Sequence, residues 1–175
     1  AELVYVNYAA DTDKDRYVEI VKKAAALNRT LILGCKDVEL AKAALEVCKE
    51  AKPVLNGADA SNYAEMSAVA TEAGVVLGVT GKDLNELYDT VTALEKAGNK
   101  NLILDVGTAS IKEAYGNAVQ IRRAAVKDQD RTFGYPTLVN VAALAHGDRV
   151  MQQALLSMFT MKYGSIVVLE TLDYA

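Results

Sequence analysis

Short apolar runs alternate with longer amphipathic stretches along this chain, and this alternation is the feature that most restricts its fold. The repeat occurs about seven times. The apolar runs are Leu3–Tyr8, Thr30–Cys35, Pro53–Asn56, Val75–Thr80, Asn101–Val106, Pro136–Val141 and Ser165–Glu170. They are almost continuously apolar, as strands buried on both faces are, and the connections are long enough for crossover helices. The sequence therefore predicts a parallel sheet covered by helices.

The length of the repeats favours an α/β fold of the (β/α)8 TIM-barrel type, in which one repeat takes about 30 residues. The alternative is a doubly wound open sheet, which often carries a glycine-rich phosphate loop after its first strand. The segment 9–13 contains no glycine, and the pattern Gly-x-Gly-x-x-Gly is absent from the chain. Because a closed barrel has about eight repeats, we expect an incomplete barrel. Residues 1–175 would then form one TIM-barrel domain that is a fragment of a larger protein.

Capping signals predict where several helices begin and end. We expect helices to begin after Thr12, Asp83 and Ser110, because an acidic residue follows each of them three positions later. Left-handed C-terminal caps are expected at Gly74, Gly98 and Gly164.

Composition excludes several classes of function. The net charge is −4 and no stripe of lysine and arginine is present, so we expect no nucleic-acid partner. No apolar segment approaches the ~20 residues that cross a bilayer, and no signal-peptide pattern is visible. We therefore expect a cytoplasmic protein without membrane contact. Its two cysteines, Cys35 and Cys48, are expected to be reduced thiols.

Few residues are suited to catalysis or metal binding. An iron–sulfur or zinc site needs about four grouped ligands, which two cysteines and one histidine cannot supply alone. That histidine, His146, is expected in a loop before a helix over Met151–Lys162. A Schiff-base lysine would lie inside a barrel, whereas Lys36 and Lys82 fall just beyond strands. We therefore expect no catalytic residue and no metal ligand in this chain.

Three polar residues interrupt apolar strands at their ends: Asn56, Asp105 and Asn140. In a barrel the working groups lie at the C-terminal ends of strands. A carboxylate there must be paired, hydrogen-bonded or exposed, and amides beside it offer paired donors and acceptors. The three are therefore candidate cofactor-binding residues that could clamp a flat heterocycle with an amide edge. The alternative is that Asp105 caps the next helix and that the asparagines shape turns.

Six segments, taken in order, carry a family resemblance. They are PVLNGA at 53–58, GVVLGV at 74–79, LDVGT at 104–108, QIRRAA at 120–125, DRTFGYP at 130–136 and KYGSIVVL at 162–169. Together they resemble the central barrel domain of the large (gamma) subunit of the corrinoid/iron–sulfur protein of the acetyl-CoA synthase/decarbonylase system. The resemblance implies a role in the one-carbon metabolism of anaerobes. Such a protein takes a methyl group from a methyl-tetrahydropterin onto cobalamin and delivers it to acetyl-CoA synthase.

The resemblance also implies partners and cofactors. The partners would be the small subunit, as a heterodimer, together with a pterin-dependent methyltransferase and acetyl-CoA synthase. Cobalamin and a 4Fe-4S cluster are implied for a full-length member, but the family carries the cluster motif and most corrinoid contacts in other domains. We therefore expect no cofactor within this fragment, which would be a scaffold or docking domain that is not catalytic alone.

A second resemblance concerns two strand ends. Leu55-Asn56 and Leu104-Asp105-Val106-Gly107 are similar to the strand-end Asn and Asp-Pro-Gly motifs of pterin-binding barrels, with Val106 in place of the proline. It implies that Asn56 and Asp105 hold the amide and amino edges of a pterin, with Asn140 near its reacting side. The alternative function is therefore a pterin-binding methyltransferase-like or dihydropteroate-synthase-like barrel enzyme.

Overall fold

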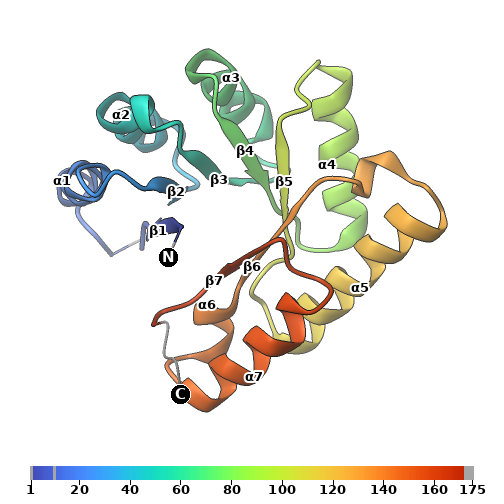
Figure 1. Ribbon diagram of the computed structural model, residues 1–175. Coiled ribbons are helices and arrows are strands. Elements are labelled where there is room, and N and C mark those ends of the chain that lie inside the picture. Colours follow the sequence, from blue (N-terminus) through green and yellow to red (C-terminus); the bar gives the residue numbers. More distant parts are fainter. Residues whose placement is uncertain (1, 10, 172–175) are drawn as a thin grey trace. The chain divides into compact units, whose positions relative to one another are not determined.

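Strands and helices alternate throughout the computed structural model of the chain, which describes residues 2–9 and 11–171 (Figure 1). The strands are β1 (Leu3–Asn7), β2 (Thr30–Gly34), β3 (Val54–Ala58), β4 (Val76–Val79), β5 (Leu102–Asp105), β6 (Thr137–Asn140) and β7 (Ile166–Val168). The α-helices are α1 (Lys14–Ala25), α2 (Val38–Cys48), α3 (Tyr63–Ala73), α4 (Leu84–Lys96), α5 (Ile111–Lys127), α6 (Val141–Ala145) and α7 (Arg149–Thr160). Short 3-10 helices are η1 (Lys49–Ala51) and η2 (Arg131–Phe133). Each strand begins within one residue of its predicted start.

The strands follow one another in the sheet in the order of the sequence, from β1 to β7. The pairings run parallel, and helices connect the successive strands. This is the topology of an α/β fold of the TIM-barrel type, as the sequence predicts. No helix within the described part of the chain is long and apolar enough to cross a membrane.

Two compact units divide the chain. The first unit contains the residues up to 79 together with 93–102, and the second unit contains 80–92 and the residues from 103 onward. The first unit therefore holds β1 to β4 with α1 to α3. The second unit holds most of β5, together with β6, β7 and α5 to α7.

Leucine side chains from neighbouring strands form the core of the first unit. Leu31, Leu33, Leu55 and Leu77 are completely inaccessible to solvent. Helices α1, α2 and α3 pack side by side along these strands (Figure 1). Their buried residues include several alanines, which allow close approach to the sheet. Each buried leucine stabilises the fold by roughly 1.5–3 kcal/mol relative to exposure.

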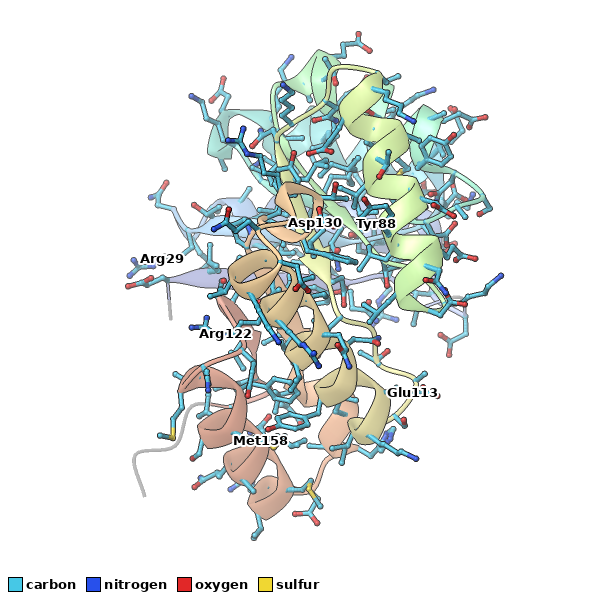
Figure 2. The ribbon with its side chains drawn as sticks, turned by 90° about the vertical axis from the view of Figure 1, so that its right-hand side faces the viewer. Arg29, Tyr88, Glu113, Arg122, Asp130 and Met158 are labelled. Atoms are coloured by element: carbon cyan, nitrogen blue, oxygen red, sulfur yellow. The ribbon has the colours of Figure 1, made fainter. Side chains whose placement is uncertain are left out.

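Aromatic contacts hold the second unit together. Tyr115 on α5 packs edge-on against Phe159 and Tyr163, with ring centroids 6.1 and 5.4 Å away. Tyr88 on α4 contacts Phe133 of η2 at 5.4 Å, on the side of the molecule seen in Figure 2. Such pairs contribute about 0.5–1.5 kcal/mol beyond the area that they bury.

Two of the three predicted helix starts are confirmed. The Ser110 hydroxyl accepts the Glu113 N–H at 3.1 Å, and Asp83 accepts the Glu86 N–H at 2.9 Å. The prediction for α1 is wrong by one residue, because the N-cap is Asp13 rather than Thr12, and its carboxylate accepts the Arg16 N–H. Aspartate is at least as favourable as threonine at the N-cap position, so Asp13 can take the place predicted for Thr12.

The predicted C-terminal caps are confirmed at Gly74 and Gly98, which have φ values of 65° and 93°. Gly164 is not left-handed, and α7 ends at Thr160 rather than at the predicted Lys162. The Gly164 N–H instead donates to the Phe159 carbonyl at 2.8 Å. A Cβ at Gly164 would lie 3.0 Å from the Val167 side chain, so this glycine serves close packing.

Helix α6 does not follow from the sequence pattern. The apolar run 136–141 predicts a strand, but the strand ends at Asn140, and Val141 begins the short helix. The helix ends where His146 adopts a left-handed φ of 48°. His146 therefore lies in the predicted loop before α7, but as the C-cap of a helix.

Replacing Gly74 by alanine should destabilise the protein by about 1–2 kcal/mol, because an L residue pays that much for the left-handed conformation. Gly116, inside α5, is the matched control. An added Cβ meets no heavy atom within 4 Å at either position, so only the backbone conformation differs. Gly116→Ala should stabilise the protein by about 0.5–1 kcal/mol. Urea unfolding measures both, and equal signs for the two variants would contradict this account.

Candidate functional site

The strand ends of the first unit present a row of alternating amide and glycine residues. Asn7 is in register with Gly34, Gly34 with Asn56, and Asn56 with Gly78. Side chains at one register level point to the same face of a sheet. Asn56, one of the predicted binding residues, therefore lies at the centre of a polar row at the carboxyl ends of β1 to β4.

The glycines of this row make room for the larger side chains beside them. A Cβ at Gly78 would collide with the Asn56 side-chain oxygen and lie 2.9 Å from its Cγ. A Cβ at Gly34 would lie 2.8 Å from the Tyr5 ring. Asn56 is only 4% exposed, and its Nδ2 donates a long hydrogen bond of 3.5 Å to the Tyr5 hydroxyl. The buried Asn56 and the half-buried Tyr5 thus occupy the space beside the glycines and form one polar pair.

A bulge at Gly57 shapes the end of β3. The register between β3 and β4 shifts between Asn56 and Ala58. Gly57 has a φ of 140°, and a Cβ there would run into the Cys35 carbonyl of the segment that follows β2. Only glycine fits such a close backbone approach. The bulge redirects the chain into the loop that precedes α3.

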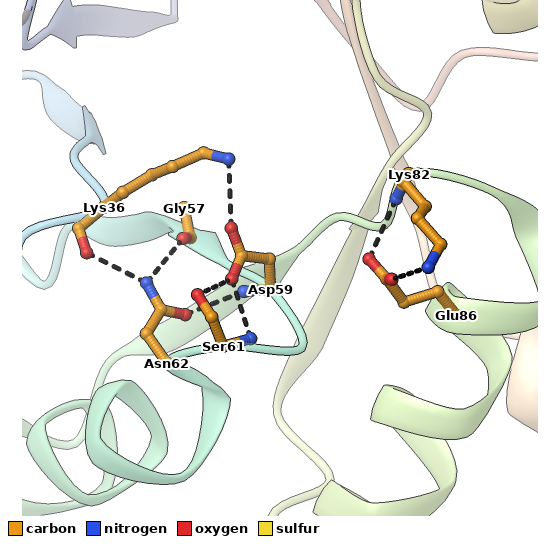
Figure 3. Close-up of polar contacts among 7 residues, drawn as sticks. All are labelled: Lys36, Gly57, Asp59, Ser61, Asn62, Lys82 and Glu86. Atoms are coloured by element: carbon orange, nitrogen blue, oxygen red, sulfur yellow. Dashed lines mark hydrogen bonds and ion pairs between the residues drawn. The ribbon is translucent and has the colours of Figure 1, made fainter.

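That loop carries a dense hydrogen-bond network that sequence reasoning missed (Figure 3). Asn62 donates through Nδ2 to the carbonyls of Lys36 and Gly57, at 2.9 and 3.3 Å. Its Oδ1 accepts the Asp59 N–H at 2.8 Å. Asp59 in turn accepts from the Ser61 backbone and hydroxyl and pairs with Lys36 at 3.0 Å. The loops after β2 and β3 are therefore joined by one network.

Electrostatics favour the charged form of Asp59. Burial raises the pKa of this carboxyl, but the hydrogen bonds from Ser61 and Lys36 outweigh it and hold the pKa below its usual value. Asp59 therefore stays ionised and holds the network together at neutral pH.

A similar lysine–aspartate pair joins the preceding loops. Lys14 at the start of α1 binds Asp37, the N-cap of α2, at 2.6 Å. This hydrogen bond lowers the pKa of Asp37 and raises the pKa of Lys14. Both lysine–aspartate pairs are 23 residues apart in sequence, so each links one strand-end loop to the next. A third ion pair, Lys82–Glu86, is local to the loop that opens α4 (Figure 3).

In the second unit, Asp105 closes a turn directly after β5. Its Oδ1 accepts the Gly107 N–H at 2.9 Å, and Gly107 takes a φ of 84°. Asn117 of α5 donates to the Val106 carbonyl at 3.0 Å and ties the same turn to the helix. The carboxylate of Asp105 is half-buried and takes part in shaping this loop.

Asn140 ends β6 and caps α6. Its side-chain oxygen accepts the Ala143 N–H at 3.0 Å, as an N-cap residue does. Asp105 is in register with Leu138, two residues before Asn140. The period of two therefore places Asp105 and Asn140 on the same face of adjacent strands. The structure brings these two predicted residues to one strand-end edge, whereas Asn56 belongs to the first unit.

The two cysteines of the chain do not supply the donor set of an iron–sulfur cluster. A 4Fe-4S cluster takes four thiolates, and the chain has only Cys35 and Cys48. Both thiols are buried and donate to backbone carbonyls. Burial raises the pKa of Cys35 and raises that of Cys48 to about 11, which disfavours the metal-binding thiolates. No three His, Cys, Asp or Glu side chains gather into a metal-binding group among residues 2–9 and 11–171.

Gly78→Ala should lower the free energy of unfolding by about 1–3 kcal/mol, because the new methyl group overlaps the Asn56 side chain. In an Asn56→Ala background, Gly78→Ala should lower the free energy of unfolding by clearly less. A double-mutant cycle measures this difference. Gly74→Ala serves as the control, since its cost arises from backbone conformation and should be equal in both backgrounds. An unchanged cost of Gly78→Ala without Asn56 would contradict the proposed overlap.

Asp59→Asn should destabilise the protein by about 1 kcal/mol at pH 7, through loss of the ion pair and weaker hydrogen bonds. The folded state lowers the pKa of Asp59, so its contribution exists above the unfolded pKa of about 3.9 and disappears as the pH falls through the folded value. The difference from wild type in urea unfolding should therefore shrink in acid. Asp89→Asn, at an exposed position of α4, should leave the free energy of unfolding unchanged at every pH. A pH-independent cost of Asp59→Asn would contradict the charge argument.

Comparison with known proteins identifies relatives along the whole chain. The family model described as CO dehydrogenase/acetyl-CoA synthase delta subunit matches residues 1–175. The corrinoid/iron-sulfur protein large subunit of Moorella thermoacetica is 34% identical over 170 residues, which cover 97% of this chain and 37% of the relative. The acetyl-CoA decarbonylase/synthase complex subunit gamma of Archaeoglobus fulgidus is 32% identical over 171 residues, covering 92% and 36%. The chain thus spans little more than a third of these relatives.

Solved structures with a similar fold include dihydropteroate synthases. The enzyme from Thermus thermophilus superposes with a TM-score of 0.72 at 19% identity, over 97% of this chain and 77% of that one. The enzyme from Burkholderia cenocepacia gives a TM-score of 0.63 at 17% identity, over 98% and 77%. At this level of identity the likeness concerns the barrel fold alone.

Proposed function

This chain belongs to the CO dehydrogenase/acetyl-CoA synthase delta subunit family, and on that premise we propose that it is the scaffold and docking barrel of a corrinoid/iron–sulfur methyl carrier. The whole carrier takes a methyl group from a methyl-tetrahydropterin onto cobalamin and delivers it to acetyl-CoA synthase. We propose that its 4Fe-4S cluster is held by other parts of the carrier, since two cysteines cannot supply four thiolates, and that other parts also make most of the contacts to its cobalamin.

The observation that carries a scaffold role is the engagement of strand-end polar groups by the chain's own backbone. Asp105 accepts the Gly107 N–H, and Asn140 accepts the Ala143 N–H. These are the groups that a barrel enzyme would aim at a ligand. Here they close a turn and begin a helix, which builds a defined loop surface.

Hydrogen bonds and ion pairs between neighbouring loops support a docking role for the strand-end loops of the first unit. Binding costs less when the contacting segments are already ordered. The Lys14–Asp37 and Lys36–Asp59 pairs link three successive strand-end loops in the first unit, and Asn62 adds contacts to two of them. We propose the small subunit of the carrier as the partner, in a heterodimer, with the pterin-dependent methyltransferase and acetyl-CoA synthase as transient partners.

One observation favours a second candidate, a pterin-binding barrel. Asn56 is a buried amide beside the Tyr5 hydroxyl at a strand end, and Asp105 ends another strand with a half-buried carboxylate. Buried amides and carboxylates are the groups that recognise a pterin ring edge. In this alternative the carboxylate charge of Asp105 is essential, whereas in the scaffold role an oxygen acceptor is sufficient.

Asp105→Asn separates the two functions, because asparagine keeps an oxygen for the Gly107 N–H but removes the charge. We expect the wild-type protein to form a stable heterodimer with the small subunit in analytical ultracentrifugation, and the variant to bind within about twofold of it. If the protein is a pterin enzyme instead, it should bind a tetrahydropterin in calorimetry. The variant should then lose about tenfold or more in affinity, as loss of a hydrogen bond to a charged group predicts.

Thermal unfolding of the wild type and of Asp105→Asn provides the control for folding. A folded wild-type protein that sediments alone at all ratios with the small subunit would contradict the docking proposal. Pterin binding that depends on the Asp105 charge would replace it with the enzyme.

A further inference from the structure

A pocket of about 410 Å³ opens on the surface of the second unit. It lies between the second half of α5, the segment that follows η2 and the turn that joins α7 to β7. Thr137 and Ser165 line it, and they stand at the starts of β6 and β7. The pocket therefore lies at the amino ends of these strands, away from the edge that carries Asp105 and Asn140.

The charged residues of this pocket are all positive. Arg122 and Lys162 line it, and no aspartate or glutamate does. Neither residue forms an ion pair with any residue that the structure describes. Arg122 extends from α5 at the surface (Figure 2), and Lys162 lies over the Tyr163 ring, 5.8 Å from its centroid. On a chain with a net charge of −4 this is a local positive site, which attracts anionic groups.

Exposed apolar side chains stand next to the two cations. Val126 on α5 is 66% exposed, and Met161 after α7 is 86% exposed. Both line the pocket together with Phe133. Exposed apolar residues gathered around a hollow mark interaction surfaces more often than scattered ones do. An occupant that covers them must offer apolar surface as well as negative charge.

Hydrogen bonds join the two strand starts and the turn that line this pocket. Thr137 Oγ1 donates to the Tyr163 carbonyl at 2.8 Å, and the Thr137 N–H donates to Ser165 Oγ at 3.3 Å. The Tyr163 ring packs edge-on against Tyr115. These contacts connect both strand starts to the turn before β7. We therefore expect the residues that line the pocket to lose little conformational freedom when a ligand binds.

We propose that this pocket receives an acidic segment of the partner subunit, with one apolar side chain seated against Val126 and Met161 and carboxylates paired with Arg122 and Lys162. The inference rests on the proposed docking function and adds a second contact surface for the partner, at the amino ends of β6 and β7, to the strand-end loops at the carboxyl ends. The two cations select an anionic occupant, and the apolar rim selects a protein segment over a small inorganic anion.

Adjacent arginines provide a matched test. Arg122 lines the pocket, whereas Arg123 is exposed on the same helix but does not line it. We expect Arg122→Glu to weaken binding of the small subunit by about tenfold or more in calorimetry, and Arg123→Glu to change it by about twofold or less. Met161→Ser should weaken binding, whereas Val150→Ser, at an 80% exposed position outside the pocket, should not. Raising the salt concentration should weaken the wild-type complex more than the Arg122→Glu complex.

Each remaining outcome contradicts the proposal in a recognisable way. Circular dichroism and thermal unfolding first confirm that all variants are folded. Equal effects of Arg122→Glu and Arg123→Glu would indicate general charge attraction and overturn the assigned surface, while the docking function would stand. A wild-type protein that does not bind the small subunit would overturn both. Loss of a homodimer on Arg122→Glu would assign the pocket to a second copy, and competition by inorganic phosphate alone, without an effect of Met161→Ser, would assign it to a small anion.

Discussion

Parallel pairing of each strand with the next one in sequence is the constraint on which this structure depends. A parallel partner cannot follow through a tight turn, so each connection must carry the chain back along the sheet. The returning segments cover the strands, and the strands must therefore be apolar along nearly their whole length. Leu33, Leu55 and Leu77, at one level of three adjacent strands, are all completely buried for this reason.

Polar side chains consequently lie at the strand ends, where they accept hydrogen bonds from backbone N–H groups. Asp105 closes a turn and Asn140 begins a helix. Asn56 is accommodated in the sheet itself because its neighbour Gly78 has no side chain. The chain's own side chains thereby give these loops defined shapes.

The fold could be predicted from the sequence because its signals are local. Apolar runs locate each described strand start to within one residue, and Ser110 caps α5 as its spacing from Glu113 indicates. The predictions are wrong where two possible cap residues are adjacent in sequence, and where tertiary packing determines the backbone conformation. Asp13 displaces Thr12 as a cap, and Gly164 serves contact with Val167 rather than a left-handed turn.

The candidate site could be predicted only in part, for the same reason. The positions of Asn56, Asp105 and Asn140 at strand ends follow from the pattern, but the partners of their side chains do not. Asn62 was missed because one of its acceptors, the Lys36 carbonyl, lies 26 residues earlier in the chain. The Asp59-x-Ser61-Asn62 run after a strand was the available signal, since such residues favour turns and helix starts.

The lysine–aspartate pairs have a consequence for how a change in the length of one loop affects the others. Each pair reaches only the adjacent loop, from Lys14 to Asp37 and from Lys36 to Asp59. A longer or shorter loop at one strand end therefore disturbs its immediate neighbours and leaves more distant loops in place. The loops of this row can therefore change in length one at a time, while the sheet beneath keeps its register.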